Sequence, residues 1–154
     1  MKKIAFWALA LFIMVCQSAF ADGYNELWKQ YEVAMAKDLP KTALGILQQI
    51  EKQAKADKQY GALLKASICR GALQSAIAPD SLLSEVKRLE AEELAVRNTQ
   101  PVFAAVYQSA LAQIYRNNYN LRNKDGKTAQ AFFDMSLQNP ELLAKTQAKG
   151  YEPM

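Results

Sequence analysis

The sequence predicts an all-α fold built from antiparallel helix hairpins, and three observations lead to this prediction. Apolar residues recur at spacings of three and four along most of the chain, which places them on one face of successive helices. Prolines and capping residues interrupt this pattern where one helix ends and the next begins. No segment of useful length alternates apolar and polar residues with a period of two, so no β-strand is predicted.

The first two helices are predicted on either side of Pro40. Proline has a fixed φ and no backbone N–H, so it suits the first turn of a helix and cannot continue the preceding one. The helix before it has one apolar face, made of Tyr24, Leu27, Trp28, Tyr31 and Met35. The helix after it runs to about Asp57 and buries Ala43, Leu44, Leu47, Ile50 and Ala54.

A second pair of helices is predicted between Tyr60 and Pro101, separated at Pro79. We expect Asp80 or Ser81 to cap the later of the two. The apolar positions of the pair are Leu63, Leu64, Ile68, Leu73 and Ile77, then Leu82, Leu83, Val86, Leu89 and Val96. The later helix also carries opposite charges four residues apart, which we expect on a solvated outer face: Arg88, Glu92, Glu93 and Arg97.

The helix that begins at Pro101 is the most apolar of the chain. Its wide stripe indicates neighbours on both sides and consists of Val102, Phe103, Val106, Tyr107, Ala110, Leu111, Ile114 and Tyr115. Two short helices are expected after it, one capped by Thr128 and one started by Asn139-Pro140. The tail around Gly150 and Pro153 is expected to be loose.

Short connections favour antiparallel neighbours, so residues 22–120 are predicted to form one helical-hairpin domain, followed by short helices and the tail over 121–154. Helix pairs restart at Tyr24, Tyr60 and Pro101, an interval of roughly 36 to 41 residues that is typical of solenoid repeats such as TPR. A closed helix bundle is the alternative arrangement.

Residues 1–21 have the three parts of a secretory signal peptide. Lys2 and Lys3 precede an apolar run of roughly 12 residues, shorter than a membrane span, and small residues stand at the −3 and −1 positions of a cut after Ala21. We therefore expect a periplasmic or secreted protein with no integral membrane span after cleavage. The alternative is a lipoprotein signal with Cys16 as the lipidated residue, which the bulky residues before that cysteine do not favour.

The composition of the part that follows the signal peptide argues against several classes of function. The formal net charge of +4 falls to about +2 without Lys2 and Lys3, too small an excess to indicate binding to nucleic acid. The chain contains no histidine, the usual general base and metal ligand, so no catalytic, metal-binding or cofactor-binding residue is predicted. After signal removal Cys69 is the one cysteine, and its apolar surroundings predict a buried small side chain.

Two groups of residues are candidates for a functional site, one acidic and one aromatic. Glu90, Glu92 and Glu93 are the densest carboxylates, and with basic residues one turn away they are predicted to form a solvated, salt-bridged surface. The aromatic side chains that could contact a partner are Trp28, Tyr31, Tyr107, Tyr115 and Tyr119. Because Trp28 and Tyr31 lie on the apolar stripe of the first helix, packing in the core is the simpler interpretation for both.

Several strings resemble the N-terminal helical region of large bacterial alpha-2-macroglobulin-like proteins. They are the segments 24–30, 37–44, 81–83, 88–90, 139–143 and 151–153. The resemblance implies an exported protein related to protease trapping, in which a bait region is cut and a Cys-x-Glu-Gln thioester couples to the protease. The sequence contains no Cys-x-Glu-Gln and no room for a bait region, so no inhibitory residue is carried over.

The sequence thus predicts an exported, non-catalytic helical interaction module, related to a protease-inhibitor system, with a protein or peptide partner in the cell envelope. The alternative is a stand-alone periplasmic TPR-like adaptor that binds a peptide or protein between its helix pairs.

Overall fold

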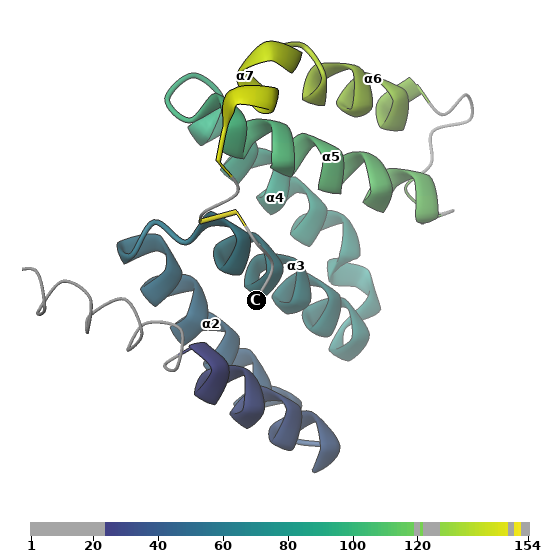
Figure 1. Cartoon of the computed structure of the whole chain (residues 1–154). Helices are drawn as coiled ribbons and strands as arrows, with labels where there is room; N and C mark the ends of the chain where they lie inside the picture. Colours follow the sequence, from purple (N-terminus) through teal and green to yellow (C-terminus); the bar gives the residue numbers. More distant parts are fainter. Residues whose placement is uncertain (1–23, 119–120, 122–126, 148–149, 152–154) are drawn as a thin grey trace, which may run out of the picture.

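The computed structural model describes residues 24–118, 121, 127–147 and 150–151, and within them every regular element is a helix (Figure 1). The elements are a first helix over residues 24–36, α2 (Pro40–Ala56), α3 (Tyr60–Ile77), the 3₁₀ turn η1 (Pro79–Ser81), α4 (Leu82–Val96), α5 (Pro101–Asn117), α6 (Lys127–Ser136) and α7 (Pro140–Lys145). The predicted all-α fold is confirmed. The predicted signal peptide and Tyr119 lie outside the described residues.

The helix starts follow the prolines. Pro40, Pro101 and Pro140 lie in the first turn of α2, α5 and α7. The expected cap of α4 is wrong for Ser81, because the intervening 3₁₀ turn directs its hydroxyl backwards. Ser81 Oγ donates to the carbonyl of Ala78 at 2.7 Å and makes no capping bond.

The first helix and α2 end in the same way. Asp38 and Lys58 adopt left-handed backbone conformations, with φ of 53° and 57°. In both cases the N–H of the following residue bonds to a carbonyl of the last helical turn at 2.9 Å, which is the Schellman geometry. The chain reverses after each of these ends and forms hairpins.

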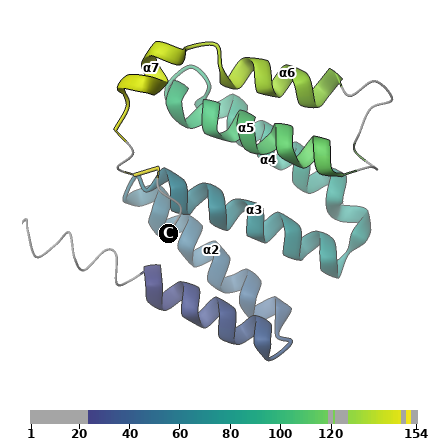
Figure 2. The ribbon, with the colours of Figure 1, turned by 45° about the vertical axis from the view of Figure 1, so that its right-hand side comes forward.

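The helices form an open stack. α2 packs on α3, α3 on α4, α4 on α5, and α5 on α6. The first helix and α6 lie at opposite ends of the molecule in both views (Figures 1 and 2). In a closed bundle the outer helices would pack against each other, so the arrangement is that of stacked, solenoid-like hairpins.

Two groups of buried side chains hold the stack together, and α3 contributes to both. The first group joins the first helix, α2 and α3, with Leu47, Ile50 and Ala54 fully buried. The second joins α3, α4, α5 and α6 around Phe103 and Leu111. Cys69 is half-buried against the first group, and burial raises the pKa of its thiol although the Lys65 ammonium acts in the opposite direction.

The C-terminal segment returns from α7 to the start of α3. The Gly61 N–H donates to the Gly150 carbonyl at 2.9 Å, and the Tyr151 ring lies 5.4 Å from the Tyr60 ring. Gly150 has a φ of +89°, which favours glycine. The loose tail expected from the sequence does not include this anchor, because its partners are far apart in sequence.

Among residues 24–118, 121, 127–147 and 150–151, no helix combines the length and the apolar character required to cross a membrane.

Candidate functional site

The aromatic residues proposed from the sequence fall into separate places. Trp28 and Tyr31 lie together beside the first core group, with their rings edge-to-face and 5.6 Å apart. The Lys65 ammonium lies 4.3 Å from the centre of the Trp28 ring, a cation–π contact. Both aromatic side chains are half-buried, so they close the edge of the core and expose part of their rings.

Tyr107, which the sequence analysis names as a possible partner contact, is buried. Its side chain is only 2 % exposed, and its hydroxyl donates to Glu92 Oε2 at 2.9 Å. Burial raises the pKa of Tyr107 well above its usual value, and the negative charge of Glu92 raises it further. The hydroxyl therefore stays protonated and acts as a hydrogen-bond donor inside the protein.

Tyr115 is half-buried and stacks on Phe132, with ring centres 5.8 Å apart. Its hydroxyl donates to Glu90 Oε1 at 2.8 Å. Burial and this hydrogen bond raise the pKa of Tyr115 to about 12. Tyr107 and Tyr115 thus stabilise α4 against α5.

A change in the pH dependence of stability is expected from Tyr115. Its pKa is raised from 10.0 to about 12 in the folded protein, so folding favours the protonated hydroxyl. The contribution of this hydroxyl to the free energy of unfolding is therefore complete below pH 10 and is lost as the pH rises towards 12. We expect Tyr115→Phe to weaken the decline in unfolding free energy between these pH values, measured by urea unfolding. An unchanged decline would show that this hydroxyl does not contribute.

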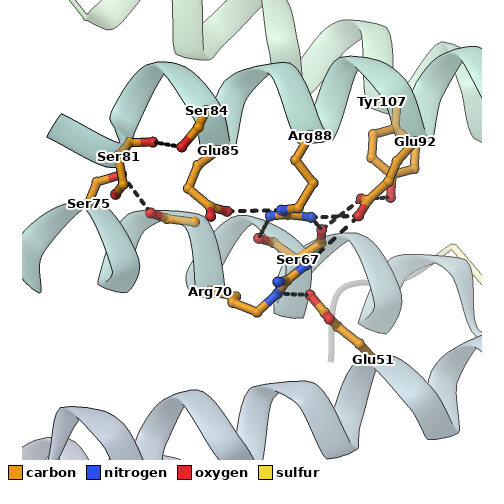
Figure 3. Close-up of polar contacts among 11 residues, drawn as sticks. Glu51, Ser67, Arg70, Ser75, Ser81, Ser84, Glu85, Arg88, Glu92 and Tyr107 are labelled. Atoms are coloured by element: carbon orange, nitrogen blue, oxygen red, sulfur yellow. Dashed lines mark hydrogen bonds and ion pairs between the residues drawn. The ribbon is translucent and has the colours of Figure 1, made fainter. Parts of the chain in front are cut away.

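The most extensive polar cluster centres on Glu92 of α4 (Figure 3). Ser67 of α3 and Tyr107 of α5 both donate to Glu92 Oε2 at 2.9 Å. Arg88, one turn earlier on α4, donates to Glu92 Oε1 at 2.6 Å. The carboxylate therefore receives hydrogen bonds from three helices.

Arg88 binds several of the same partners. Its guanidinium donates to Glu85 at 2.9 Å, to the Ser67 hydroxyl at 2.7 Å and to the Ser67 carbonyl at 3.0 Å. Burial alone would lower the pKa of Arg88, but the hydrogen bonds and charges of Glu85 and Glu92 raise it above its usual value. Arg88 is consequently a fixed cation between α3 and α4.

Arg70 extends the cluster to α2. It donates to Glu51 at 2.8 Å, and a second nitrogen lies 3.9 Å from Glu92 Oε1. We name Glu51, Ser67, Arg70, Glu85, Arg88, Glu92 and Tyr107 the Glu92 network. It connects α2, α3, α4 and α5 through charge-assisted hydrogen bonds.

The predicted solvated charge face of α4 is partly wrong. The expected pairs Arg88–Glu92 and Arg97–Glu93 both form, at 2.6 Å. Glu93, however, is only 1 % exposed, because it faces α5, where the Gln108 amide donates to it at 2.6 Å. Burial of this carboxylate is compensated by Arg97 and Gln108.

A cavity of about 360 Å³ opens between α2 and α4 beside the Glu92 network. We name it the α2–α4 groove. Its lining combines apolar side chains with polar groups of the Glu92 network, and two lysines lie on its α2 side. The lining residues are Gln48, Glu51, Lys52, Lys55, Leu63, Ser67, Glu92, Ala95, Val96, Phe103 and Tyr107.

This composition is typical of a binding site, in which apolar walls surround a few polar groups. A second cavity of about 410 Å³, next to Ile68 and Ile114, has mostly apolar lining and a single charged side chain, Glu85. In the part of the chain that the structure describes, no group of three or more acidic or cysteine side chains is placed to hold a metal ion.

The sequence contained no signal for the α2–α4 groove. Lys52 and Lys55 look like ordinary solvated positions of an amphipathic helix, and Val96 looks like a core residue. Only the packing of α2 and α4 on α3 brings them to one cavity.

Comparison of the chain with protein-family models, with curated proteins and with solved structures finds no match.

Proposed function

We propose that this chain is an exported, non-catalytic helical interaction module that holds a segment of a protein partner in the α2–α4 groove. The observation that carries the proposal is the groove itself: a cavity of about 360 Å³ on an open helix stack, with apolar walls and charged side chains at one side. Such stacks commonly bind extended partners along the surfaces between their helices.

The state of the polar groups in the groove supports a binding role over catalysis. Both oxygens of Glu92 accept hydrogen bonds from Arg88, Ser67 and Tyr107. The raised pKa of Tyr107 keeps its hydroxyl protonated, so it is a poor base or nucleophile at neutral pH. These groups are arranged to stabilise one another.

Export is supported by the composition of residues 1–21. Cleavage after Ala21 would leave a chain of about 15 kDa from the 17.2 kDa precursor, located in the periplasm or secreted. Mass spectrometry of the protein from the envelope and the medium tests this, with Asp22 as the expected first residue. An acylated Cys16 at the N-terminus would instead support the lipoprotein alternative.

The resemblance to alpha-2-macroglobulin-like proteins supports a place for this module in a protease-inhibitor system. The alternative, a stand-alone TPR-like adaptor, is favoured by the groove, because its lining comes entirely from α2–α5. An immunoblot of envelope and secreted fractions from the source cell separates the two. A band of about 15 kDa supports the adaptor, and a band many times larger supports the macroglobulin-like protein.

Photocrosslinking in the source cell tests the interaction itself. With p-benzoyl-phenylalanine in place of Ala95, an exposed residue that lines the groove, we expect a discrete adduct with an envelope protein. Lys41 provides the matched control, since it is exposed on α2 and does not line the groove. Absence of an adduct from position 95, or the same adduct from position 41, would contradict the proposal.

A further inference from the structure

We propose that the α2–α4 groove binds acidic peptide segments, pairing their carboxylates with Lys52 and Lys55 and inserting an apolar side chain between Leu63, Val96 and Phe103. This inference rests on the proposed function and adds to it the chemistry of the partner.

The lysines provide positive charge that forms no ion pair with any residue that the structure describes. Lys52 and Lys55 are exposed and one turn apart on α2, so their ammonium groups reach the same side of the groove. Within the described residues, neither takes part in an ion pair. An incoming carboxylate can therefore bind both without displacing an existing contact.

The acidic residues of the groove are already neutralised. Glu51 accepts a hydrogen bond from Arg70 at 2.8 Å. Glu92 is bound by Arg88 at 2.6 Å and by two hydroxyls. A basic peptide would have to break these bonds to reach either carboxylate, so the charge distribution favours an acidic ligand.

The remaining lining favours a peptide over a small free acid. Leu63 and Val96 are half-buried and Phe103 is buried beside them, which leaves an apolar surface for one inserted side chain. Gln48 is exposed one turn before Lys52, and its amide can both donate to and accept from a peptide backbone. A cavity of about 360 Å³ accommodates a few side chains of an extended segment.

Fluorescence anisotropy with the purified full chain tests the inference. The probe is a fluorescein-labelled peptide in which two glutamates precede and two follow a central leucine, and a matched probe has glutamine in place of each glutamate. We expect the glutamate probe to bind at least tenfold more tightly than the glutamine probe. The difference should shrink as salt is added, because the lysines are exposed.

Charge reversal locates the binding. Lys52→Glu with Lys55→Glu should weaken binding of the glutamate probe at least tenfold. The control pair is Lys37→Glu with Lys41→Glu, which changes the net charge equally at exposed positions outside the groove and should change the affinity less than twofold. Val96→Ser should weaken both probes, since it removes part of the apolar surface.

Three outcomes would overturn the inference: no binding of the glutamate probe, equal binding of the glutamine probe, or equal weakening by the two charge-reversal pairs. If any of these occurs while position 95 still crosslinks to an envelope protein, acidic segments do not bind in the groove and the proposed function stands. If the glutamate probe binds as expected and no crosslink forms, the groove chemistry holds and the proposed function fails.

Discussion

Replacement of Arg88 by alanine is expected to lower the free energy of unfolding by about 3 kcal/mol. Arg88 donates to Glu85, Glu92 and Ser67, and 22 % of its side chain is exposed. Its removal leaves the Ser67 carbonyl without this donor and places two carboxylates near each other without the cation between them. The decrease in unfolding free energy therefore has two sources: the hydrogen bonds that Arg88 no longer makes, and the cost of keeping their former partners partly buried without a donor.

Urea unfolding followed by circular dichroism measures this effect. The matched control is Lys87→Ala on the same helix, because Lys87 is exposed and adjacent in sequence to Arg88. We expect a change below about 0.5 kcal/mol for the control. Equal effects of the two substitutions would contradict a structural role for the Glu92 network.

Replacement of Leu47 by alanine is expected to lower the free energy of unfolding by about 2–5 kcal/mol. Leu47 has no exposed surface and lies in the first core group, between the first helix, α2 and α3. The substitution removes apolar contacts and leaves a cavity. The surrounding helices cannot move in to fill this cavity, because each of them also packs against other helices. Leu39→Ala is the control, since the Leu39 side chain is 47 % exposed.

Urea unfolding followed by circular dichroism measures the effect of Leu47→Ala and also tests whether the two core groups unfold together. Leu63 of α3 packs against both groups, and the Glu92 network connects α2 with α5. We therefore expect Leu47→Ala and Leu111→Ala each to shift one common unfolding transition. Separate transitions in either variant would show that the stack unfolds in parts.

Helix positions could be predicted because their signals are local. Pro40, Pro101 and Pro140 mark helix starts in the sequence and lie in the first turns of α2, α5 and α7. The charge pairs on α4 follow from spacing within a single helix. Both depend only on residues a few positions apart.

The direction in which a side chain faces depends on the neighbouring helices, which spacing within one helix does not determine. Glu93 looks like a surface residue in the sequence, yet α5 buries it against Gln108. Tyr107 looks available to a partner, yet Glu92 binds its hydroxyl in the interior. In both cases a polar partner from another helix compensates the burial.

The candidate site could not be predicted for the same reason. Its lysines come from α2, its apolar side chains from α3, α4 and α5, and no local spacing connects them. The contact of Gly150 and Tyr151 with the start of α3 also joins residues far apart in sequence. Such features depend on tertiary packing, which periodicity alone does not determine.

If acidic segments bind in the α2–α4 groove, a bound peptide changes the environment of the residues that line it. Nuclear magnetic resonance spectra of the isotope-labelled chain, recorded while the glutamate probe is added, report this change residue by residue. We expect the amide shifts of four lining residues to change: Lys52, Lys55, Leu63 and Val96. Changes confined to the cavity beside Ile68 and Ile114, or no changes at all, would show that acidic segments do not bind in this groove.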